Sequence, residues 1–252
     1  MTRIIMHGCN GHMGQVISDI IAKDDDCIMA AGIDINPDAV SNPYPVFTSL
    51  KDCDVEADVV IDFSSAKAID GLLEDCAAKK LPLVLCTTGL SPEQLKKTEA
   101  VSQEIPLLRS ANMSLGVNTI MKLVAAAATV LANAGYDMEI VEKHHNKKVD
   151  APSGTALALA DVMNEVLNNE YTYKYDRSQE RVRRSEKEIG ISAVRGGTIV
   201  GEHEVFFCGQ DEVVEIKHTA YSKAIFGKGA VQAAKFLAEQ KPGYYNMSNV
   251  IG

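Results

Sequence analysis

The first part of the chain alternates short apolar runs with stretches of helical periodicity. The apolar runs predict strands over residues 3–7, 27–34, 58–63, 81–87 and 105–108, and the stretches between them predict helices over residues 14–23, 66–79 and 92–103. Regular strand–helix alternation indicates a parallel sheet covered by helices on both faces. Continuous apolar sequence such as Val59-Val60-Ile61 is typical of a strand buried on both sides.

The pattern changes after about residue 112. We expect a long apolar helix over residues 115–134, a strand over 136–144, a helix over 153–167, and a loop or short exposed helix in the polar segment 168–187. Strands are then expected over 189–195, 198–207 and 212–219, and the breaks at 196–197 and 209–211 predict antiparallel hairpins. A last helix over 222–239 should end near Pro242. The predicted fold class is α/β: a Rossmann-like, doubly wound parallel sheet domain, plus a smaller α+β domain with a mixed, largely antiparallel sheet.

Charge and hydrophobicity narrow the classes of partner. Acidic residues outnumber basic ones by 34 to 25, and the net charge of −9 argues against nucleic acid. The longest apolar run, residues 123–131, is shorter than the roughly 20 residues that a bilayer span needs. The first strand begins too early for a signal peptide, and the six cysteines show neither metal nor redox spacing. We therefore expect a soluble, cytoplasmic protein with reduced cysteines and no membrane partner.

A glycine-rich turn joins the first predicted strand to the first helix. Its sequence is Gly8-Cys9-Asn10-Gly11-His12-Met13-Gly14. Glycines in this context permit a tight turn and a close approach of the backbone to a pyrophosphate, which the helix N-terminus then attracts. The spacing differs from G-x-G-x-x-G, so an ordinary glycine-rich turn is the alternative. In this position we expect the turn to bind a dinucleotide.

The end of the second predicted strand bears on the choice of cofactor. Asp34 lies at the distance from the glycines at which an acidic residue accepts hydrogen bonds from the adenosine ribose. The next residues, Ile35 and Asn36, supply no arginine for a 2′-phosphate. We expect NADH to be used well, with NADPH as the alternative if His12 or a lysine from elsewhere accommodates the phosphate.

Two further strand ends should reach the same edge of the sheet, where ligands of open α/β sheets bind. They carry small or polar residues that suit the nicotinamide and its ribose, although loop structure alone also explains them. These residues are Cys86, Thr87 and Thr88 after one strand, and Ser110, Ala111, Asn112 and Met113 after the other.

A cationic cluster, Lys143-His144-His145-Asn146-Lys147-Lys148, ends the strand predicted at 136–144. Lysine and histidine supply charge-assisted hydrogen bonds to carboxylates, and histidine transfers protons near neutral pH. The amides of Gly154 and Thr155, at the start of the next helix, offer a second anion site, although Ser153 or Thr155 can instead cap that helix. The cluster predicts a site for a small dianion. A surface turn is the alternative, and a metal site is disfavoured because no matching ligand set lies nearby.

Together these residues resemble the dihydrodipicolinate reductase family, also called 4-hydroxy-tetrahydrodipicolinate reductase, over nearly the whole chain. The segment from Glu142 to Ala156 resembles the family signature E-x-H-H-x-x-K-x-D-A-P-S-G-T-A. The glycine turn, the segment 86–89, the segment 110–118, Arg195-Gly196-Gly197 and Val200-Gly201-Glu202-His203 follow the family pattern as well. Three departures are Cys86 in place of a usual glycine, Ile35 in place of an arginine found in some members, and His12 in place of a basic residue.

The resemblance implies an oxidoreductase of the diaminopimelate route of lysine biosynthesis, which transfers a hydride from NAD(P)H to a cyclic unsaturated imine dicarboxylate to give tetrahydrodipicolinate. It implies a dinucleotide-binding domain of residues 1–113 and 222–252, a substrate-binding and oligomerisation domain of residues 114–221, and a homotetramer. His144 and Lys148 would transfer protons, and His145, Ser153, Gly154 and Thr155 would bind the substrate. The residues implied to hold the dinucleotide are Gly8, Cys9, Asn10, Gly11, His12, Met13, Asp34, Cys86, Thr87, Thr88, Ser110, Ala111, Asn112 and Met113.

Two other functions are compatible with parts of this pattern. One is a different Rossmann-type reductase of amino-acid metabolism, such as a semialdehyde or homoserine dehydrogenase. The other is a non-catalytic module that senses dinucleotides. The H-H-x-x-K segment joined to P-S-G-T argues against the first, and a cationic cluster beside a helix N-terminus argues against the second.

Overall fold

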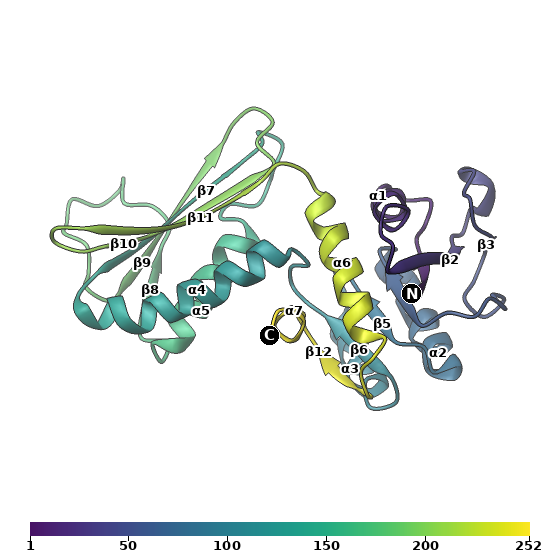
Figure 1. Ribbon diagram of the computed structural model, residues 1–252. Coiled ribbons are helices and arrows are strands. Elements are labelled where there is room, and N and C mark those ends of the chain that lie inside the picture. Colours follow the sequence, from purple (N-terminus) through teal and green to yellow (C-terminus); the bar gives the residue numbers. More distant parts are fainter. The chain divides into compact units, whose positions relative to one another are not determined.

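The computed structural model describes residues 1–252 and divides into two compact units. The first unit contains Met1–Leu115 and Ala224–Gly252, and the second contains Gly116–Lys223. The chain therefore leaves the first unit, forms the second, and returns to the first in its C-terminal segment. Figure 1 labels most of the helices and strands of both units.

The first unit is built on a seven-stranded sheet with the order β12-β6-β5-β4-β1-β2-β3, in which all the strand pairs are parallel. The strand order reverses at β1, since the chain continues to one side through β2 and β3 and to the other through β4, β5 and β6. In open α/β sheets ligands bind at such a reversal, beyond the carboxyl ends of the strands. The strands are β1 (Thr2–His7), β2 (Cys27–Ile33), β3 (Val46–Phe47), β4 (Val59–Asp62), β5 (Leu83–Leu85), β6 (Pro106–Arg109) and β12 (Gly243–Tyr245).

Helices cover both faces of this sheet, which confirms the doubly wound arrangement. Successive strand residues point to opposite faces, so Ile4 and Met6 join one apolar cluster and Ile5 joins the other. The first cluster receives α1 (His12–Ile21) and α6 (Ala224–Leu237), and the second receives α2 (Ile69–Lys79) and α3 (Pro92–Val101). The remaining helices are short: η1 (Pro37–Ala39), η2 (Ala66–Ala68) and α7 (Met247–Val250).

The second unit contains a mixed five-stranded sheet with the order β11-β10-β7-β9-β8. Two strand pairs, β10 with β11 and β10 with β7, are antiparallel, whereas β7 with β9 and β8 with β9 are parallel. Figure 1 shows α4 (Leu115–Leu131) and α5 (Gly154–Val166) along one side of this sheet, and their buried residues Val124 and Leu159 join its core. The strands are β7 (Asp137–His144), β8 (Thr172–Lys174), β9 (Glu188–Arg195), β10 (Gly201–Cys208) and β11 (Val213–Ala220), and η3 (Ala132–Ala134) follows α4.

One predicted hairpin is wrong. The break at Gly196-Gly197 was expected to join two paired antiparallel strands, but β9 pairs with β7, and β7 lies between β9 and β10. Glycines report where a strand ends and do not identify its partner, and β7, which is buried at alternate positions, takes the central place in the sheet. The hairpin of β10 and β11 is confirmed. The segment 168–187 was expected to lack strands, but it contains β8.

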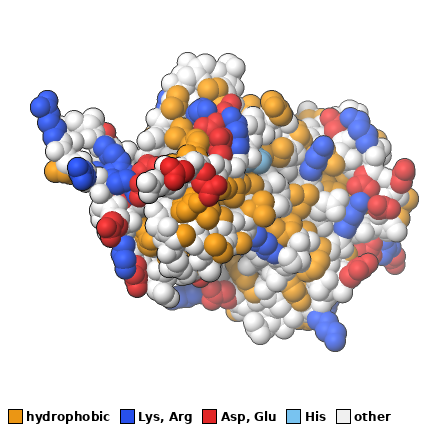
Figure 2. All heavy atoms as spheres, turned by 60° about the vertical axis from the view of Figure 1, so that its left-hand side comes forward, with side chains coloured by type: hydrophobic (Ala, Val, Ile, Leu, Met, Phe, Trp, Pro, Cys, Tyr) orange, Lys and Arg blue, Asp and Glu red, His pale blue; other side chains and the backbone are white.

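The surface of the second unit carries apolar side chains. The helix Leu115–Ala134 is long and apolar enough to cross a membrane, whereas the sequence pattern alone suggested a shorter run; a single helix of this kind is also what a core helix of a soluble protein looks like. Figure 2 shows hydrophobic side chains gathered between charged groups on the face that it displays. Exposed apolar residues of this unit include Leu123 and Val130 on α4, Val213 and Val214 on β11, and Tyr221 just after β11.

Candidate functional site

The glycine turn connects β1 to α1 at the carboxyl edge of the first sheet. Gly8 has a φ of +83°, and a Cβ there would lie 2.7 Å from the carbonyl oxygen of Phe63. A Cβ on Gly14 would lie 2.3 Å from the carbonyl oxygen of Gly8. Both positions therefore require glycine, one for its backbone conformation and the other for the close contact of α1 with the turn.

The N-terminus of α1 is open to an anion. Its N-cap is Gly11, no side chain accepts a hydrogen bond from the first turn, and that turn contains no acidic residue. The first amide N–H groups of a helix lack partners within the helix and carry partial positive charge, which favours a phosphate. Cys9 is fully buried with its side chain in the core, so it offers only its main chain to a ligand.

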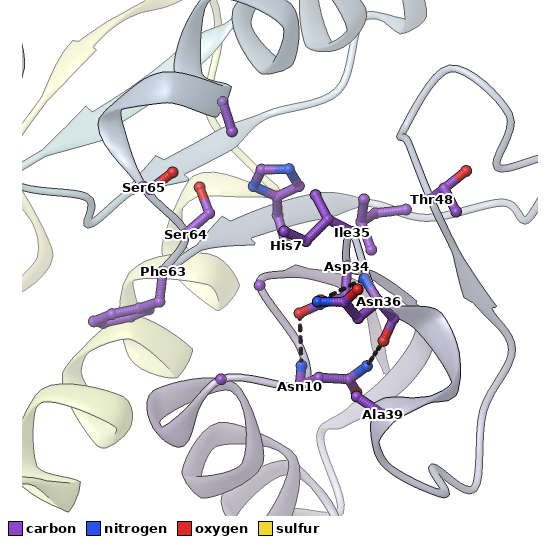
Figure 3. A pocket seen from close by; sticks show the side chains of 14 residues that line it. His7, Asn10, Asp34, Ile35, Asn36, Ala39, Thr48, Phe63, Ser64 and Ser65 are labelled. Atoms are coloured by element: carbon purple, nitrogen blue, oxygen red, sulfur yellow. Dashed lines mark hydrogen bonds between the residues drawn. The ribbon is translucent and has the colours of Figure 1, made fainter.

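A pocket of about 410 Å³ lies beside this turn (Figure 3). Residues that follow β1, β2 and β4 line it, which is where a doubly wound sheet places a dinucleotide. The titratable side chains in its wall are His7 and Asp34, and neither a lysine nor an arginine lines it. The pocket wall therefore offers no cationic side chain to a ligand.

Asp34 is already engaged with the turn. Its Oδ2 accepts a hydrogen bond from the Asn10 amide at 3.1 Å, and its Oδ1 accepts one from the Asn36 amide at 3.0 Å. The Asn10 side chain donates to the Asn36 carbonyl oxygen at 2.7 Å, so the ends of β1 and β2 are joined. A carboxylate has about four acceptor sites, which leaves capacity for ribose hydroxyls.

A histidine–aspartate pair in the same place was missed by the sequence analysis. His7 Nδ1 lies 2.7 Å from Asp62 Oδ1, which also accepts a hydrogen bond from the Ser64 hydroxyl at 2.6 Å. Asp62 is fully buried, and its Oδ2 has no hydrogen-bond partner. In Figure 3 the ring of His7 projects into the pocket near Ser64. The available signal was a histidine immediately before Gly8, after the apolar run Ile4-Ile5-Met6.

The other residues predicted to hold the cofactor differ in how they are placed. The Thr87 hydroxyl accepts a hydrogen bond from the Ser64 amide at 3.1 Å, which ties the ends of β4 and β5 together. Burial raises the pKa of the Cys86 thiol well above its usual range. The Met113 side chain packs in the core, so only its main chain can face a ligand. The Asn112 side chain accepts a hydrogen bond from the Ser114 amide. Ser110 is half-buried. The exposed residues of this set are Gly11, His12, Thr88 and Ala111.

In the second unit, the buried side chains of β7 change from apolar to ionisable toward the carboxyl end of the strand. Its buried positions alternate, and they pass from Met138 and Ile140 to Glu142 and His144. Glu142 is fully buried and lies 2.6 Å from His144, through its Oε2 and the histidine Nδ1. Lys143 lies on the opposite face of the strand, where it pairs with Glu204 at 2.8 Å. The predicted cationic cluster is thus divided between two faces of the sheet.

Arg195, at the end of β9, compensates the buried charge of Glu142. Its two terminal nitrogens donate to the two carboxylate oxygens at 2.8 and 2.6 Å. Burial alone would raise the pKa of Glu142, but hydrogen bonds from Arg195, His144 and the Ser153 amide outweigh it and lower the pKa. Glu142 is therefore ionised near neutral pH. Glu142 and Arg195 belong to the family pattern in the sequence, but the pattern implied no role for either residue.

Ser153 connects the start of α5 to the same cluster. Its amide donates to Glu142 Oε1 at 3.0 Å, and its hydroxyl accepts from the Ala156 amide at 3.2 Å as the N-cap of α5. The hydroxyl also lies 2.9 Å from His203 Nε2. Burial, and then the charge of His144, lowers the pKa of His203 to about 4. The Ser153 side chain is thus hydrogen-bonded within the protein.

Lys148, His145 and Gly154 lie around the end of β7. Lys148 Nζ lies 2.8 Å from Asp150 Oδ1, and its amide donates to the His145 carbonyl oxygen at 3.1 Å. His145 Nδ1 is buried with no hydrogen-bond partner. Gly154 is exposed with open space where a Cβ would lie, and Thr155 is half-buried. This arrangement provides a titratable ring, an ammonium group and the first amides of a helix, which together can bind an anion and transfer a proton.

Comparison with known proteins extends the match to the full chain. Two family descriptions match, "Dihydrodipicolinate reductase, N-terminus" over residues 2–113 and "Dihydrodipicolinate reductase, C-terminus" over residues 116–251. A 4-hydroxy-tetrahydrodipicolinate reductase of Caldanaerobacter subterraneus subsp. tengcongensis is 52% identical, with 100% of this chain and 98% of the relative covered. A protein of the same name from Clostridium novyi is 45% identical at the same coverage.

Solved structures agree on the fold. A dipicolinate-bound dihydrodipicolinate reductase from Paenisporosarcina sp. TG-14 superposes with a TM-score of 0.83 at 24% identity, with 99% of each chain covered. A myo-inositol dehydrogenase from Corynebacterium glutamicum superposes with a TM-score of 0.57 at 14% identity, over 100% of this chain and 92% of that one. The difference between the two scores places the fold nearer to the first.

Proposed function

The chain belongs to the dihydrodipicolinate reductase family of NAD(P)H-dependent enzymes of lysine and diaminopimelate biosynthesis, and we propose that it reduces 4-hydroxy-tetrahydrodipicolinate (dihydrodipicolinate) to tetrahydrodipicolinate. The observation that carries this proposal is the set of groups at the carboxyl end of β7. His144, Lys148 and the start of α5 there combine proton transfer with anion binding, as a cyclic imine dicarboxylate requires.

The first unit provides the features that a nicotinamide dinucleotide needs. The uncapped N-terminus of α1 would hold the pyrophosphate, and Asp34 would accept hydrogen bonds from the adenosine ribose. Thr87, Thr88 and the segment 110–113 would lie toward the nicotinamide. When bound, the reduced nicotinamide supplies a hydride to the conjugated ring of the substrate.

Cofactor preference follows from the wall of the pocket. Position 35, directly after Asp34, is an isoleucine that is 84% exposed, and a cation is absent from the lining. An adenosine 2′-phosphate would gain no charge-assisted hydrogen bond there. We therefore propose that NADH is used well, and at least as readily as NADPH.

The second unit would hold and protonate the substrate. We propose that Lys148, His145 and the start of α5 at Gly154 and Thr155 bind the two carboxylates. His144 or Lys148 would give a proton to the ring carbon as the enamine returns to the imine. The proton comes from an N–H bond of the side chain, which is left neutral, and the enamine electron pair forms the new C–H bond.

We propose a soluble, cytoplasmic homotetramer assembled through the sheet of the second unit. That sheet ends in β11, an edge strand whose Val213 and Val214 are exposed. Exposed apolar residues on an edge strand are suited to pairing with another chain. Analytical ultracentrifugation tests this proposal: a tetramer is expected, and a monomer at micromolar concentration would contradict it.

The activity can be tested by following NADH and NADPH oxidation spectrophotometrically, with the substrate generated by a preceding synthase. Oxidation that depends on the synthase product is the expected result. Oxidation with an aspartate semialdehyde instead would indicate a different reductase. Cofactor binding by calorimetry without turnover on either substrate would indicate a dinucleotide-sensing module.

A further inference from the structure

We propose that Glu142 is a positioning residue that fixes the tautomer of His144, so that Nδ1 carries the ring proton and Nε2 is the nitrogen presented to a ligand. The structural part of this proposal concerns only the second unit. Its catalytic consequence rests on the proposed function, because it requires that His144 transfer a proton to or from the substrate.

The hydrogen bond between the two side chains has a defined direction. Glu142 receives two hydrogen bonds from Arg195 and one from the Ser153 amide, in addition to its 2.6 Å contact with His144 Nδ1. The donors from Arg195 and Ser153 stabilise the ionised carboxylate without any contribution from His144. An ionised carboxylate only accepts hydrogen bonds, so Nδ1 must be the donor. The neutral ring is then the Nδ1–H tautomer, with a lone pair on Nε2.

The surroundings of His144 Nε2 leave this nitrogen accessible. In the ladder of β7 and β10, Gly201 adjoins the end of β7, and a Cβ built on it would lie 3.1 Å from His144 Nε2. The glycine therefore leaves open a space beside Nε2 that any other residue would narrow. His144 makes its hydrogen bond to the protein through Nδ1, and its side chain keeps 10% of its surface exposed. Nε2 is consequently the nitrogen available to a bound molecule.

The orientation of the His144 ring is fixed as well as its tautomer. His203 lies edge-on to His144, with ring centroids 5.2 Å apart and planes at 74°. His203 is itself anchored to the Ser153 hydroxyl at 2.9 Å. Because the pKa of His203 is about 4, this neighbour is neutral at physiological pH and places no second positive charge beside His144.

The consequence is that one nitrogen serves both directions of proton transfer. The protonated ring donates from Nε2, and after donation it is left as the Nδ1–H tautomer that Glu142 already favours. The neutral ring accepts at the same nitrogen. A ring free to adopt the other tautomer would place its proton where a ligand requires a lone pair. A third group that orients an acid or base in this way is a recurring arrangement in enzymes.

The test combines nitrogen NMR of histidine-labelled protein with kinetics. In the wild type, the His144 signals, assigned by their loss in the His144→Asn variant, should show protonated Nδ1 and unprotonated Nε2 above neutral pH. In Glu142→Gln the carboxamide can donate to Nδ1, so the Nε2–H tautomer should gain population. kcat should then fall by roughly 10²–10⁴-fold, the range of general acid–base catalysis, with a smaller change in KM.

Two further variants distinguish the positioning of His144 from a general loss of stability. Glu139→Gln removes a glutamate of the same strand that is also paired with an arginine, Arg177 at 2.8 Å, but faces away from His144. It should keep both the tautomer and kcat. Gly201→Ala should lower kcat while the Nδ1–H tautomer persists, because it narrows the space at Nε2 without changing a charge.

The outcomes distinguish this proposal from the proposed function. An Nε2–H tautomer in the wild-type protein would overturn the positioning role, even if Glu142→Gln failed to fold. An inverted tautomer in Glu142→Gln with unchanged kcat would overturn its catalytic consequence. Wild-type protein that shows the Nδ1–H tautomer but reduces no dihydrodipicolinate would leave the positioning role intact and reject the proposed function.

Discussion

The candidate sites of the two units are built from different parts of the polypeptide. The glycine turn of the first unit offers mainly main-chain groups, and its shape depends on the absence of side chains at Gly8 and Gly14. The end of β7 in the second unit offers side chains arranged around a buried charge, Glu142. A main-chain site should tolerate changes of charge nearby but not added atoms. A side-chain site should tolerate added atoms nearby but not changes of charge. This contrast can be tested at several positions.

The largest effect is expected at His144. Replacement by asparagine removes the titratable ring and keeps a polar side chain, so kcat should fall by roughly 10²–10⁴-fold. NADH affinity should change little, since the glycine turn belongs to the other unit. Stopped-flow kinetics and fluorescence titration of NADH measure the two quantities. If turnover is unchanged, His144 has no part in the chemistry, and the contrast between the two sites loses its catalytic side.

The next effect is expected at Gly8. Alanine there would place a Cβ 2.7 Å from the Phe63 carbonyl oxygen and force a side chain into a φ of +83°. We expect a loss of about 3 kcal/mol in the free energy of unfolding, and a weaker affinity for NADH. The matched control is Gly71→Ala in α2, where a Cβ meets nothing within 4 Å. That change should stabilise by up to about 1 kcal/mol, and equal effects at the two glycines in urea unfolding would refute the steric argument.

A third test uses pH to probe the second unit. Burial lowers the pKa of His203 from 6.5 to about 4, so between these values the unfolded chain binds a proton that the folded chain does not. Stability should therefore be complete above pH 6.5 and decline as the pH falls toward 4, by about 3 kcal/mol. The pKa of His218 is lowered by burial too, and its contribution has the same sign. Urea unfolding of His203→Gln should show a flatter profile between pH 6.5 and 4; an unaltered profile would contradict this assignment.

The smallest effect is expected at Ile35. Arginine at this exposed position adds the cation that the pocket wall lacks, and it should improve kcat/KM for NADPH relative to NADH by about tenfold, which corresponds to about 1.4 kcal/mol. Ile35→Gln is the control for length without charge and should leave the ratio nearly constant. An equal response to arginine and glutamine would show that charge does not determine cofactor choice here.

The elements that could be predicted from the sequence share one property: their signal is local. The continuous apolar run Val59-Val60-Ile61 and the periodicity of α2 depend on neighbouring residues alone, and both elements, β4 and α2, lie where they were expected. The strands β3 and β12 are too short to produce a pattern, and they exist because a longer neighbour offers hydrogen bonds. The predicted pairing of the strands on either side of Gly196-Gly197 was wrong, because the whole sheet determines which strands pair.

The same distinction applies to the two sites. The glycine turn and the segment from Lys143 to Thr155 are contiguous in sequence, and both could be recognised there. The pair His7 and Asp62 is 55 residues apart, and Glu142 and Arg195 are 53 apart. Each of these contacts depends on which strands lie side by side, and the order of strands was not available from sequence pattern. The partners of the chemical groups were therefore harder to find than the groups themselves.

The return of the chain to the first unit has a consequence for protein synthesis. One face of the first sheet packs on Ala230, Ala233 and Leu237 of α6, which the ribosome makes after the whole second unit. The part of that face that α6 covers must remain exposed on the nascent chain while β7 to β11 are already available to fold. The second unit should thus acquire protease resistance first, and the first unit only upon release of the C-terminus.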